Sequence, residues 1–415
     1  MHISLLQIKW SYGLRRDGNV LFGFFLYFSI LFGFFIPYGS ASIFVYASTL
    51  YYFTRGLKYS RLSFYFLLSG VTLLSYISFI SIVNLDGIVS WFLIKEIFIY
   101  LTLFVLFVLI IELDRFDNNW KDSFFRGIVL IGFIASLLSI SNYVATFYFS
   151  YDFLSEYSWM ANQQSWSMRL TGVLANPNNL AYFLSLPVLL HLYLISNRKK
   201  IIFDYFIFLV LVFSVLLTGS KGAIIPLILS FILLFYFFQN LRKFLIKFLF
   251  LFIVVVVVFF NELGDIERVS QLLDRLLLSE GLTSNQYRGK LLFDYLKNYE
   301  NNPLSMLFGN GFIHFVSDKP PDNSLLRMIY HFGFVLAFIP IFFFIFLYRK
   351  YFLMSTIRSD KYFSLIIVFF TILSSLSNDW IISKTFWIFI AISIIILRKE
   401  VLASSKRQKL EGKLY

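Results

Sequence analysis

Long, uninterrupted apolar segments constrain this chain more than any other feature of its sequence. Each is about 17 to 25 residues long, the length that a helix needs to cross about 30 Å of hydrocarbon. Charged residues make up only 14% of the chain, whereas they make up about a quarter of a soluble domain. The sequence therefore predicts an all-α polytopic membrane protein and excludes a soluble globular enzyme. We expect about twelve transmembrane helices, at residues 20–36, 38–54, 62–83, 88–111, 124–150, 174–195, 201–219, 222–238, 244–260, 325–348, 362–380 and 383–397.

Basic residues alternate along the chain in a way that predicts its orientation. Clusters of Lys and Arg occupy every second connection between the apolar segments, and 25 of the 36 basic residues fall on one side. Such an excess marks the cytoplasmic side of a membrane. We therefore expect both termini to be cytoplasmic, and we interpret the net charge of +13 as a topology signal rather than as a nucleic-acid-binding surface. An alternative in which the first span is a cleaved signal peptide leaves the remaining topology unchanged.

The predicted topology divides the chain into three parts. Residues 1–260 contain transmembrane helices 1 to 9, residues 261–323 form one large outer loop, and residues 324–415 contain helices 10 to 12 and a cytoplasmic tail. The loop has six basic and nine acidic residues, so its net charge is −3. Within it, Ser270–Leu282 and Gln286–Tyr299 carry apolar residues at helical spacing, which is typical of helices that lie on a membrane surface.

Few residues inside the predicted spans can carry ion or redox chemistry. The chain has no cysteine, and its four histidines lack the spacing of a zinc site, so we expect no metal centre. Lys95 and Glu96 are the exception, about 10 Å below the outer end of the fourth span. We expect Lys95 to extend to the outer interface, and the alternative is a coupling site of a transporter.

The first of three polar clusters at the outer face is the segment RLTGVLANPNNLA, which opens the sixth span. Asn176 suits the N-cap of this helix, and Pro177 suits its first position. The free N–H groups and partial positive charge of a helix start can hold an anion, and Arg169 can add a charge-assisted contact. The alternative is a well-capped helix with an interfacial arginine.

The second cluster is the segment TGSKGA, which opens the eighth span. Ser220 suits the N-cap, and Lys221 lies beside it. A short polar turn between two spans accounts for these residues equally well.

The third cluster is PPDNSLLRMIYHFG, where the outer loop enters the tenth span. Asp322, Asn323 or Ser324 can cap the helix. Asn323, Arg327 and His331 follow one another at i+4 spacing and form one polar stripe. An intramembrane stripe that contains an arginine is expected to face the bundle rather than lipid, which favours a function here.

The order and sidedness of these segments resemble the O-antigen polymerase and ligase superfamily. The resemblance covers roughly residues 169–333: RLTGVLANPNN, TGSKGA, a long loop containing YRGKLLFDYLKNYENNPLSMLFGNG, and then PPDNSLLRMIYHFG. It implies a GT-C-like glycosyltransferase of the bacterial inner membrane that needs no metal or other cofactor. The implied substrate is an undecaprenyl-diphosphate-linked oligosaccharide, used at the periplasmic face, and a chain-length regulator is a further implied partner.

The resemblance also implies roles for single residues. Arg169 and Arg288 correspond to contacts of the diphosphate, and Lys221 stands where members usually have an arginine, so a bidentate contact is lost there. Residues 309–311 (GNG) match a glycine-containing turn late in the loop. Ligases tend to have a histidine where this chain has Asp322, which favours the Wzy-type polymerase over the WaaL-type ligase.

Together these considerations give a set of candidate site residues. The diphosphate-binding candidates are Arg169, Arg288, Lys221, Asn176 and Asn323, and the catalytic candidates are Asp322, His331 and Arg327. Asp322 or His331 can assist deprotonation of an acceptor hydroxyl, and the sequence does not choose between them. The rival functions are a ligase that transfers finished polymer to lipid A-core and a flippase or other transporter of lipid-linked oligosaccharide.

The predicted topology can be tested by cysteine labelling in this naturally cysteine-free chain. Cysteines introduced at Ser279 and Ser317 should react with a membrane-impermeant thiol reagent added outside the cell, because both lie in the outer loop. A cysteine at Ser404 should react only after the membrane is opened. Labelling of Ser404→Cys in sealed cells would overturn the orientation, and the proposed outer site with it.

Overall fold

The chain folds as a bundle of long helices. The computed structural model describes residues 40–54, 56, 59–84, 91–116, 120–149, 151, 170, 172–174, 176–196, 201–263, 293–294, 297, 303–311, 324–377 and 384–411. Within these ranges all regular structure is helical. The long helices are α2 (Ser40–Thr54), α3 (Arg61–Asn84), α4 (Trp91–Phe116), α5 (Trp120–Phe149), α6 (Pro177–Ser196), α7 (Ile202–Leu217), α8 (Lys221–Phe237), α9 (Gln239–Leu263), α13 (Ser324–Met354), α14 (Arg358–Ser377) and α15 (Lys384–Glu411). The short ones are η3 (Gly172–Leu174) and α12 (Pro303–Phe308).

These helices support the prediction of a polytopic membrane protein. Six are long and apolar enough to cross a membrane, with spans at Ser63–Ile82, Glu96–Leu113, Phe124–Thr146, Pro177–Ser196, Leu326–Met354 and Arg358–Leu376. Three shorter apolar helices run over Ile202–Leu217, Lys221–Phe237 and Thr385–Arg398. Every predicted span from the second to the twelfth overlaps a long helix, and the first lies outside the described residues. The total of twelve spans stays a prediction.

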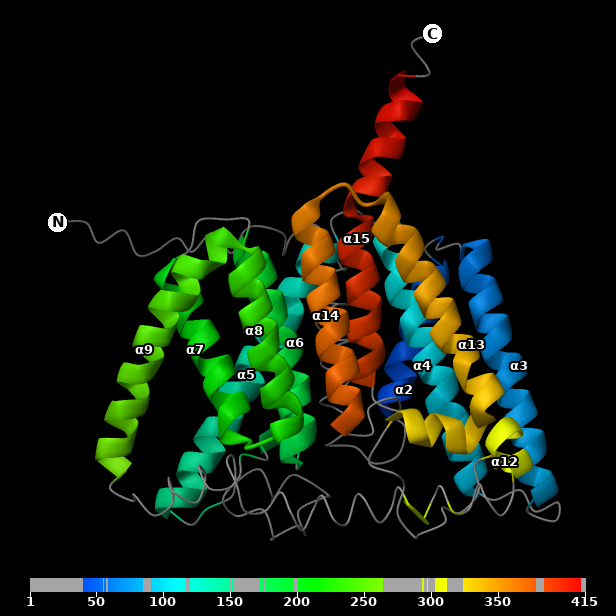
Figure 1. Ribbon diagram of the computed structural model, residues 1–415, viewed down its shortest axis with the longest axis horizontal. Coiled ribbons are helices and arrows are strands. Elements are labelled where there is room, and N and C mark those ends of the chain that lie inside the picture. Colours follow the sequence, from blue (N-terminus) through cyan, green and yellow to red (C-terminus); the bar gives the residue numbers. More distant parts are fainter. Residues whose placement is uncertain are drawn as a thin grey trace.

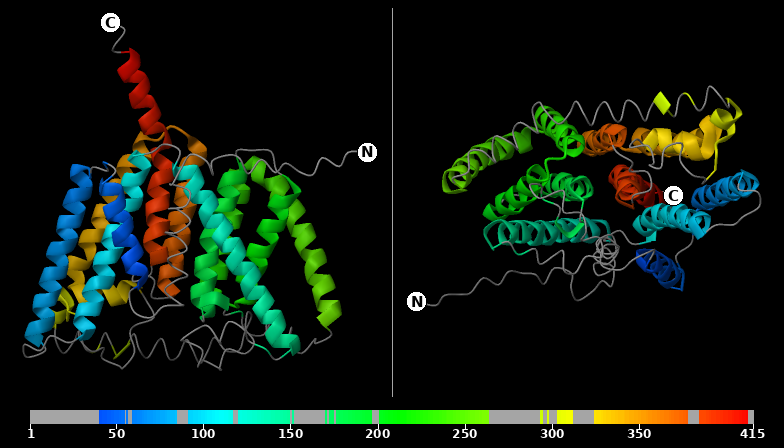
Figure 2. Two further views of the ribbon diagram at one scale, coloured as in Figure 1. Left: turned by 180° about the vertical axis from the view of Figure 1, so that it is seen from behind. Right: turned by 90° about the horizontal axis from the view of Figure 1, so that it is seen from below.

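Two helices, α6 and α15, form the centre of the bundle. Nearly all residues of α6 are buried, and so is the stretch of α15 from Trp387 to Arg398. Helices that are apolar all round are expected where protein covers every side. The helix α6 packs against α5, α7 and α8, while α15 packs against α4, α13 and α14 (Figures 1 and 2). Contact between α14 and α8 joins the two groups, and large apolar side chains remain exposed on outer helices such as α3, α9 and α13.

The two ends of the bundle differ in charge. The α8–α9 connection, the α13–α14 connection and the C-terminal part of α15 all lie at the upper end in Figure 1. These elements contain basic pairs, namely Arg242 and Lys243, Arg349 and Lys350, Arg358 and Lys361, and Arg398 and Lys399. The first residues of α6, α8 and α13, together with α12, lie at the lower end (Figure 1). The described basic pairs therefore gather at one end, as the alternating pattern predicts.

The helix α13 is not the continuous span that we predicted at residues 325–348. Its backbone breaks at Gly333, which has φ 73° and ψ 165°. The residues before Gly333 lie across the lower end of the bundle, and those after it rise through the bundle (Figure 1). The stripe that contains Arg327 and His331 therefore belongs to the transverse part of α13 rather than to a straight membrane-crossing helix.

The kink is held by the glycine turn that follows α12. The amide of Asn310 donates to the carbonyl of Tyr330 at 2.8 Å, and the amide of Gly311 donates to the carbonyl of His331 at 3.2 Å. The approach is so close that a Cβ on Gly333 would collide with the Leu307 carbonyl oxygen and the Gly309 amide. Hydrogen bonds that a straight helix would make within itself are thus replaced by bonds to the end of the outer loop.

Alanine substitutions of two glycines should separate the effect of backbone conformation on stability from the effect of close packing. Both Gly333 and Gly56 have positive φ, which costs an L-residue about 1 to 2 kcal/mol, but only Gly333 lacks room for a Cβ. Gly56→Ala should destabilise the protein by about that amount. Gly333→Ala should lose about 2 to 5 kcal/mol, since overpacking adds to the strain. Thermal unfolding of the purified variants measures the difference. Equal losses of stability in the two variants would contradict the close packing of the glycine turn against Gly333.

Candidate functional site

The start of α6 is capped as the sequence predicts. The Asn176 side-chain oxygen accepts hydrogen bonds from the amides of Asn178 at 2.9 Å and Asn179 at 3.3 Å. Pro177 occupies the first helical position, where a missing N–H has no consequence. The partial positive charge of the helix start is therefore directed toward the lower end of the bundle (Figure 1).

The start of α8 lies beside the segment that leads into α6. The amide of Leu170 donates to the carbonyl of Leu217 at 3.0 Å, which ties the segment before α6 to the end of α7. Lys221 is the first residue of α8 and is partly buried. Ser220 occupies the N-cap position, as the sequence predicts. Its backbone amide is held by the Thr218 hydroxyl at 3.2 Å, and its own hydroxyl makes no capping bond.

Arg327 and His331 form the best-defined polar cluster at this end. Arg327 Nε donates toward His331 Nε2 at 3.4 Å, and Arg327 Nη2 lies 3.9 Å from Glu96 Oε2 on α4. The exposed fractions are 5% for Arg327, 1% for His331 and 5% for Glu96. Arg327 and His331 thus face the interior of the bundle, as the presence of an intramembrane arginine predicts.

The surroundings of His331 define its hydrogen-bonding roles. His331 Nδ1 lies 2.8 Å from the Gly311 carbonyl oxygen, which can only accept, so this nitrogen carries a proton. The neutral ring can then accept the Arg327 Nε proton at Nε2. Both ring nitrogens are engaged, and His331 joins the transverse part of α13 to the glycine turn. A histidine held in this way positions its neighbours.

Glu96 is the functional candidate that the sequence did not assign. Lys95 and Glu96 both fall inside the predicted fourth span, but the expected role belonged to Lys95, whose side chain lies outside the described residues. A signal was nevertheless present, because Glu96 and Arg327 were both expected within about two turns of the outer face. Their opposite charges, both near the same end of the predicted spans, favour a pair.

Four predicted site residues lie outside the described residues: Arg169, Arg288, Asp322 and Asn323. Leu170, next to Arg169, is described and bonds to Leu217 at the end of α7, and Ser324, next to Asn323, is the first residue of α13. Of the outer loop, Phe293, Asp294 and Lys297 are helical, within the second predicted amphipathic helix. The first, at residues 270–282, lies outside the described residues.

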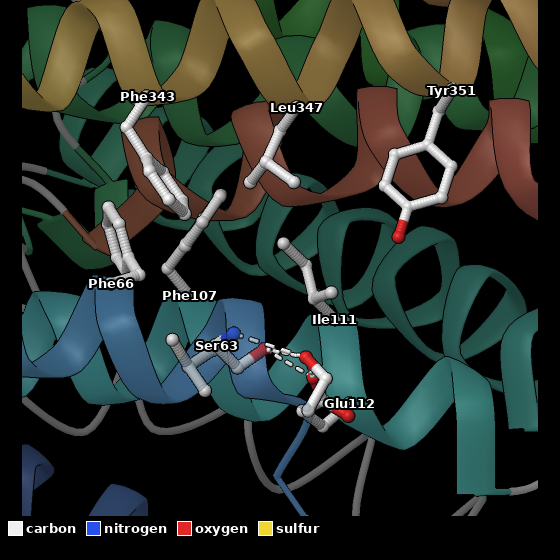
Figure 3. Close-up of a pocket in the computed structure, with 10 residues that line it drawn as sticks. Ser63, Phe66, Phe107, Ile111, Glu112, Phe343, Leu347 and Tyr351 are labelled. Carbon is white, nitrogen blue, oxygen red and sulfur yellow. Dashed lines mark hydrogen bonds between the residues drawn. The ribbon is translucent and has the colours of Figure 1, made fainter.

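A pocket of about 300 Å³, including its part open to solvent, lies at the other end of α4. Figure 3 shows it between α3, α4 and α13, with aromatic and aliphatic walls. Its polar end is Glu112, which is 1% exposed and accepts hydrogen bonds from the hydroxyls of Ser63 and, at 2.7 Å, Ser60. Burial, and then the Glu112 charge, raise the pKa of the nearby Tyr59 hydroxyl. This pocket is remote from the predicted site.

Comparison with known proteins leaves the family of the chain open. No protein-family model matches it, and no curated protein matches it significantly.

Two substitutions at Asn176 should separate capping from anion binding. Asn176→Ala removes the cap and should destabilise the protein by about 1 kcal/mol, whereas Asn176→Asp preserves the cap. If the helix start also binds an anionic diphosphate, the new carboxylate should raise KM for a lipid-linked diphosphate substrate at least about tenfold, because like charges repel. Unfolding and kinetics measure the two effects, and an Asn176→Asp protein with unchanged KM would reduce Asn176 to a helix cap.

Proposed function

We propose that this chain is a glycosyltransferase of the bacterial cytoplasmic membrane with a GT-C-like bundle of about twelve transmembrane helices. It polymerises undecaprenyl-diphosphate-linked oligosaccharide repeat units, of the O-antigen or capsule type, at the periplasmic face. Both of its termini are cytoplasmic.

One observation carries this proposal. The starts of α6, α8 and α13 share the end of the bundle that lies away from the basic pairs (Figure 1). The first part of α13 carries the buried Arg327 and His331, and Arg327 contacts the buried Glu96. By the positive-inside rule this end faces outward. An outward-facing set of helix starts and a buried arginine suits a substrate that presents a diphosphate at the outer surface of the membrane.

The proposed reaction needs positive charge more than it needs an acid. An acceptor hydroxyl attacks the anomeric carbon, the bond from that carbon to the diphosphate oxygen breaks, and the diphosphate leaves on its lipid carrier. Negative charge grows on the leaving oxygens, where Arg169, Arg288 and Lys221 stabilise it together with the α6 start. The arginine fork and the helix N–H groups provide this stabilisation without a metal ion.

The proton of the acceptor hydroxyl passes to a carboxylate in this proposal. Asp322 and His331 are the two candidates from the sequence. Since both His331 nitrogens are engaged with Arg327 and Gly311, we assign the base to Asp322 and a positioning role to His331. Arg327 follows Asp322 by five residues in the sequence and can orient the reacting sugar.

Deletion of the gene tests the proposal against its rivals. Loss of a polymerase should leave single repeat units on the final acceptor, as seen by gel analysis of surface polysaccharide. Loss of a ligase should leave no units on the acceptor and polymer stalled on the lipid carrier. A flippase defect should leave lipid-linked units on the cytoplasmic face, and a laddered pattern that is merely fainter would contradict all three functions.

Substitutions of the cationic residues should differ in their effect on turnover. If these residues only anchored the protein at the membrane interface, the effects would be equal. Alanine at Arg169 or Arg288 should lower turnover by about one to two orders of magnitude, since each charge-assisted hydrogen bond contributes about 1.5 to 3 kcal/mol. Lysine should restore activity only in part. Lys297, which is exposed on the outer loop, and Arg275 are the matched controls and should tolerate alanine.

Polymer length and membrane abundance, measured for each variant, check this ranking. Equal losses at all four positions would show that the arginines are interfacial anchors.

A further inference from the structure

The helix α4 carries a buried glutamate near each of its ends, and their surroundings differ. Glu112 accepts hydrogen bonds from the hydroxyls of Ser60 and Ser63, two residues at the start of α3. Glu96 lies at the other end, beside a guanidinium from α13. A buried carboxylate is expensive unless it is paired. The serines satisfy that need at Glu112, whereas the partner of Glu96 is itself a candidate site residue.

The contacts of Arg327 hold its guanidinium on two sides. His331 Nε2 lies 3.4 Å from Nε, and Glu96 Oε2 lies 3.9 Å from Nη2. His331 is in turn held by the Gly311 carbonyl at 2.8 Å. The guanidinium is planar, so contacts at two of its nitrogens define the orientation of the third. The two contacts therefore fix the plane of the guanidinium.

We propose that Glu96 is a positioning residue that orients Arg327 toward the sugar or diphosphate of the substrate. This inference rests on the proposed function and adds to it a residue from α4, a helix that none of the motifs at residues 169–333 includes. The carboxylate acts through the guanidinium and does not itself touch the substrate. The glycine turn and His331 fix one side of Arg327, and Glu96 fixes the other.

Glutamine substitutions at the two ends of α4 test this inference. Glu96→Gln keeps the shape of the side chain and removes its charge, so Arg327 loses its electrostatic restraint. The turnover number of the full-length protein in proteoliposomes should fall about tenfold, with KM for the lipid-linked repeat unit changed less than about twofold, as expected for misplacement of a transition-state contact. Glu96→Asp, which retains the charge, should recover part of the loss. Glu112→Gln is the matched control and should leave activity per folded molecule unchanged.

A second substitution separates positioning from folding. In an Arg327→Gln background there is no cation to orient, so adding Glu96→Gln should change turnover less than about twofold. The melting temperature of each variant shows separately whether the substitution affects folding. Losses that multiply in the double variant, or a Glu96→Gln protein with normal activity per folded molecule, would overturn the role of Glu96. A wild-type protein without polymerising activity would instead overturn the proposed function, so the two failures are distinguishable.

Discussion

Backbone hydrogen bonding in a medium without water is the constraint on which this structure depends. In the hydrocarbon core every N–H and C=O must find a partner within the protein, and helices meet this demand within one segment. The break in α13 departs from this pattern. There, Asn310 and Gly311 donate to carbonyls of Tyr330 and His331, so the end of the outer loop completes the hydrogen bonding of the kinked helix. Irregular backbone at this depth is tolerated only where protein or a cavity surrounds it.

The same constraint sets where charge can be placed. At the basic end, Arg398 donates to the Ile111 carbonyl at 2.7 Å and Lys121 donates to the Ile395 carbonyl at 3.2 Å, so buried cations join α15 to α4 and α5. At the opposite end Arg327 faces a carboxylate and a histidine. Cations that bind carbonyl groups of neighbouring helices hold the bundle together. A cation held by ionisable side chains near helix starts suits the proposed role, which is to stabilise negative charge that develops on a substrate.

Sequence reasoning predicted the helices well, because long apolar segments and alternating basic clusters are local signals. It also placed the cap at Asn176 and the inward-facing stripe of Arg327 and His331. It did not predict the kink at Gly333, since the kink depends on Leu307, Phe308 and Gly309, which approach Gly333 from the end of the outer loop. The pairing of Glu96 with Arg327 joins residues more than two hundred positions apart, and no helical periodicity relates them. Roles for Arg169, Arg288, Asp322 and Asn323, which lie outside the described residues, rest on the sequence.

The most direct test of the central claim is elongation by the purified chain alone. The protein would be placed in liposomes with undecaprenyl-diphosphate-linked repeat units as the only sugar substrate, in the presence of a chelator. The proposed site predicts a ladder of longer lipid-linked products, because arginines and helix starts provide the positive charge. Absence of elongation, or elongation that appears only when a divalent ion is restored, would contradict it.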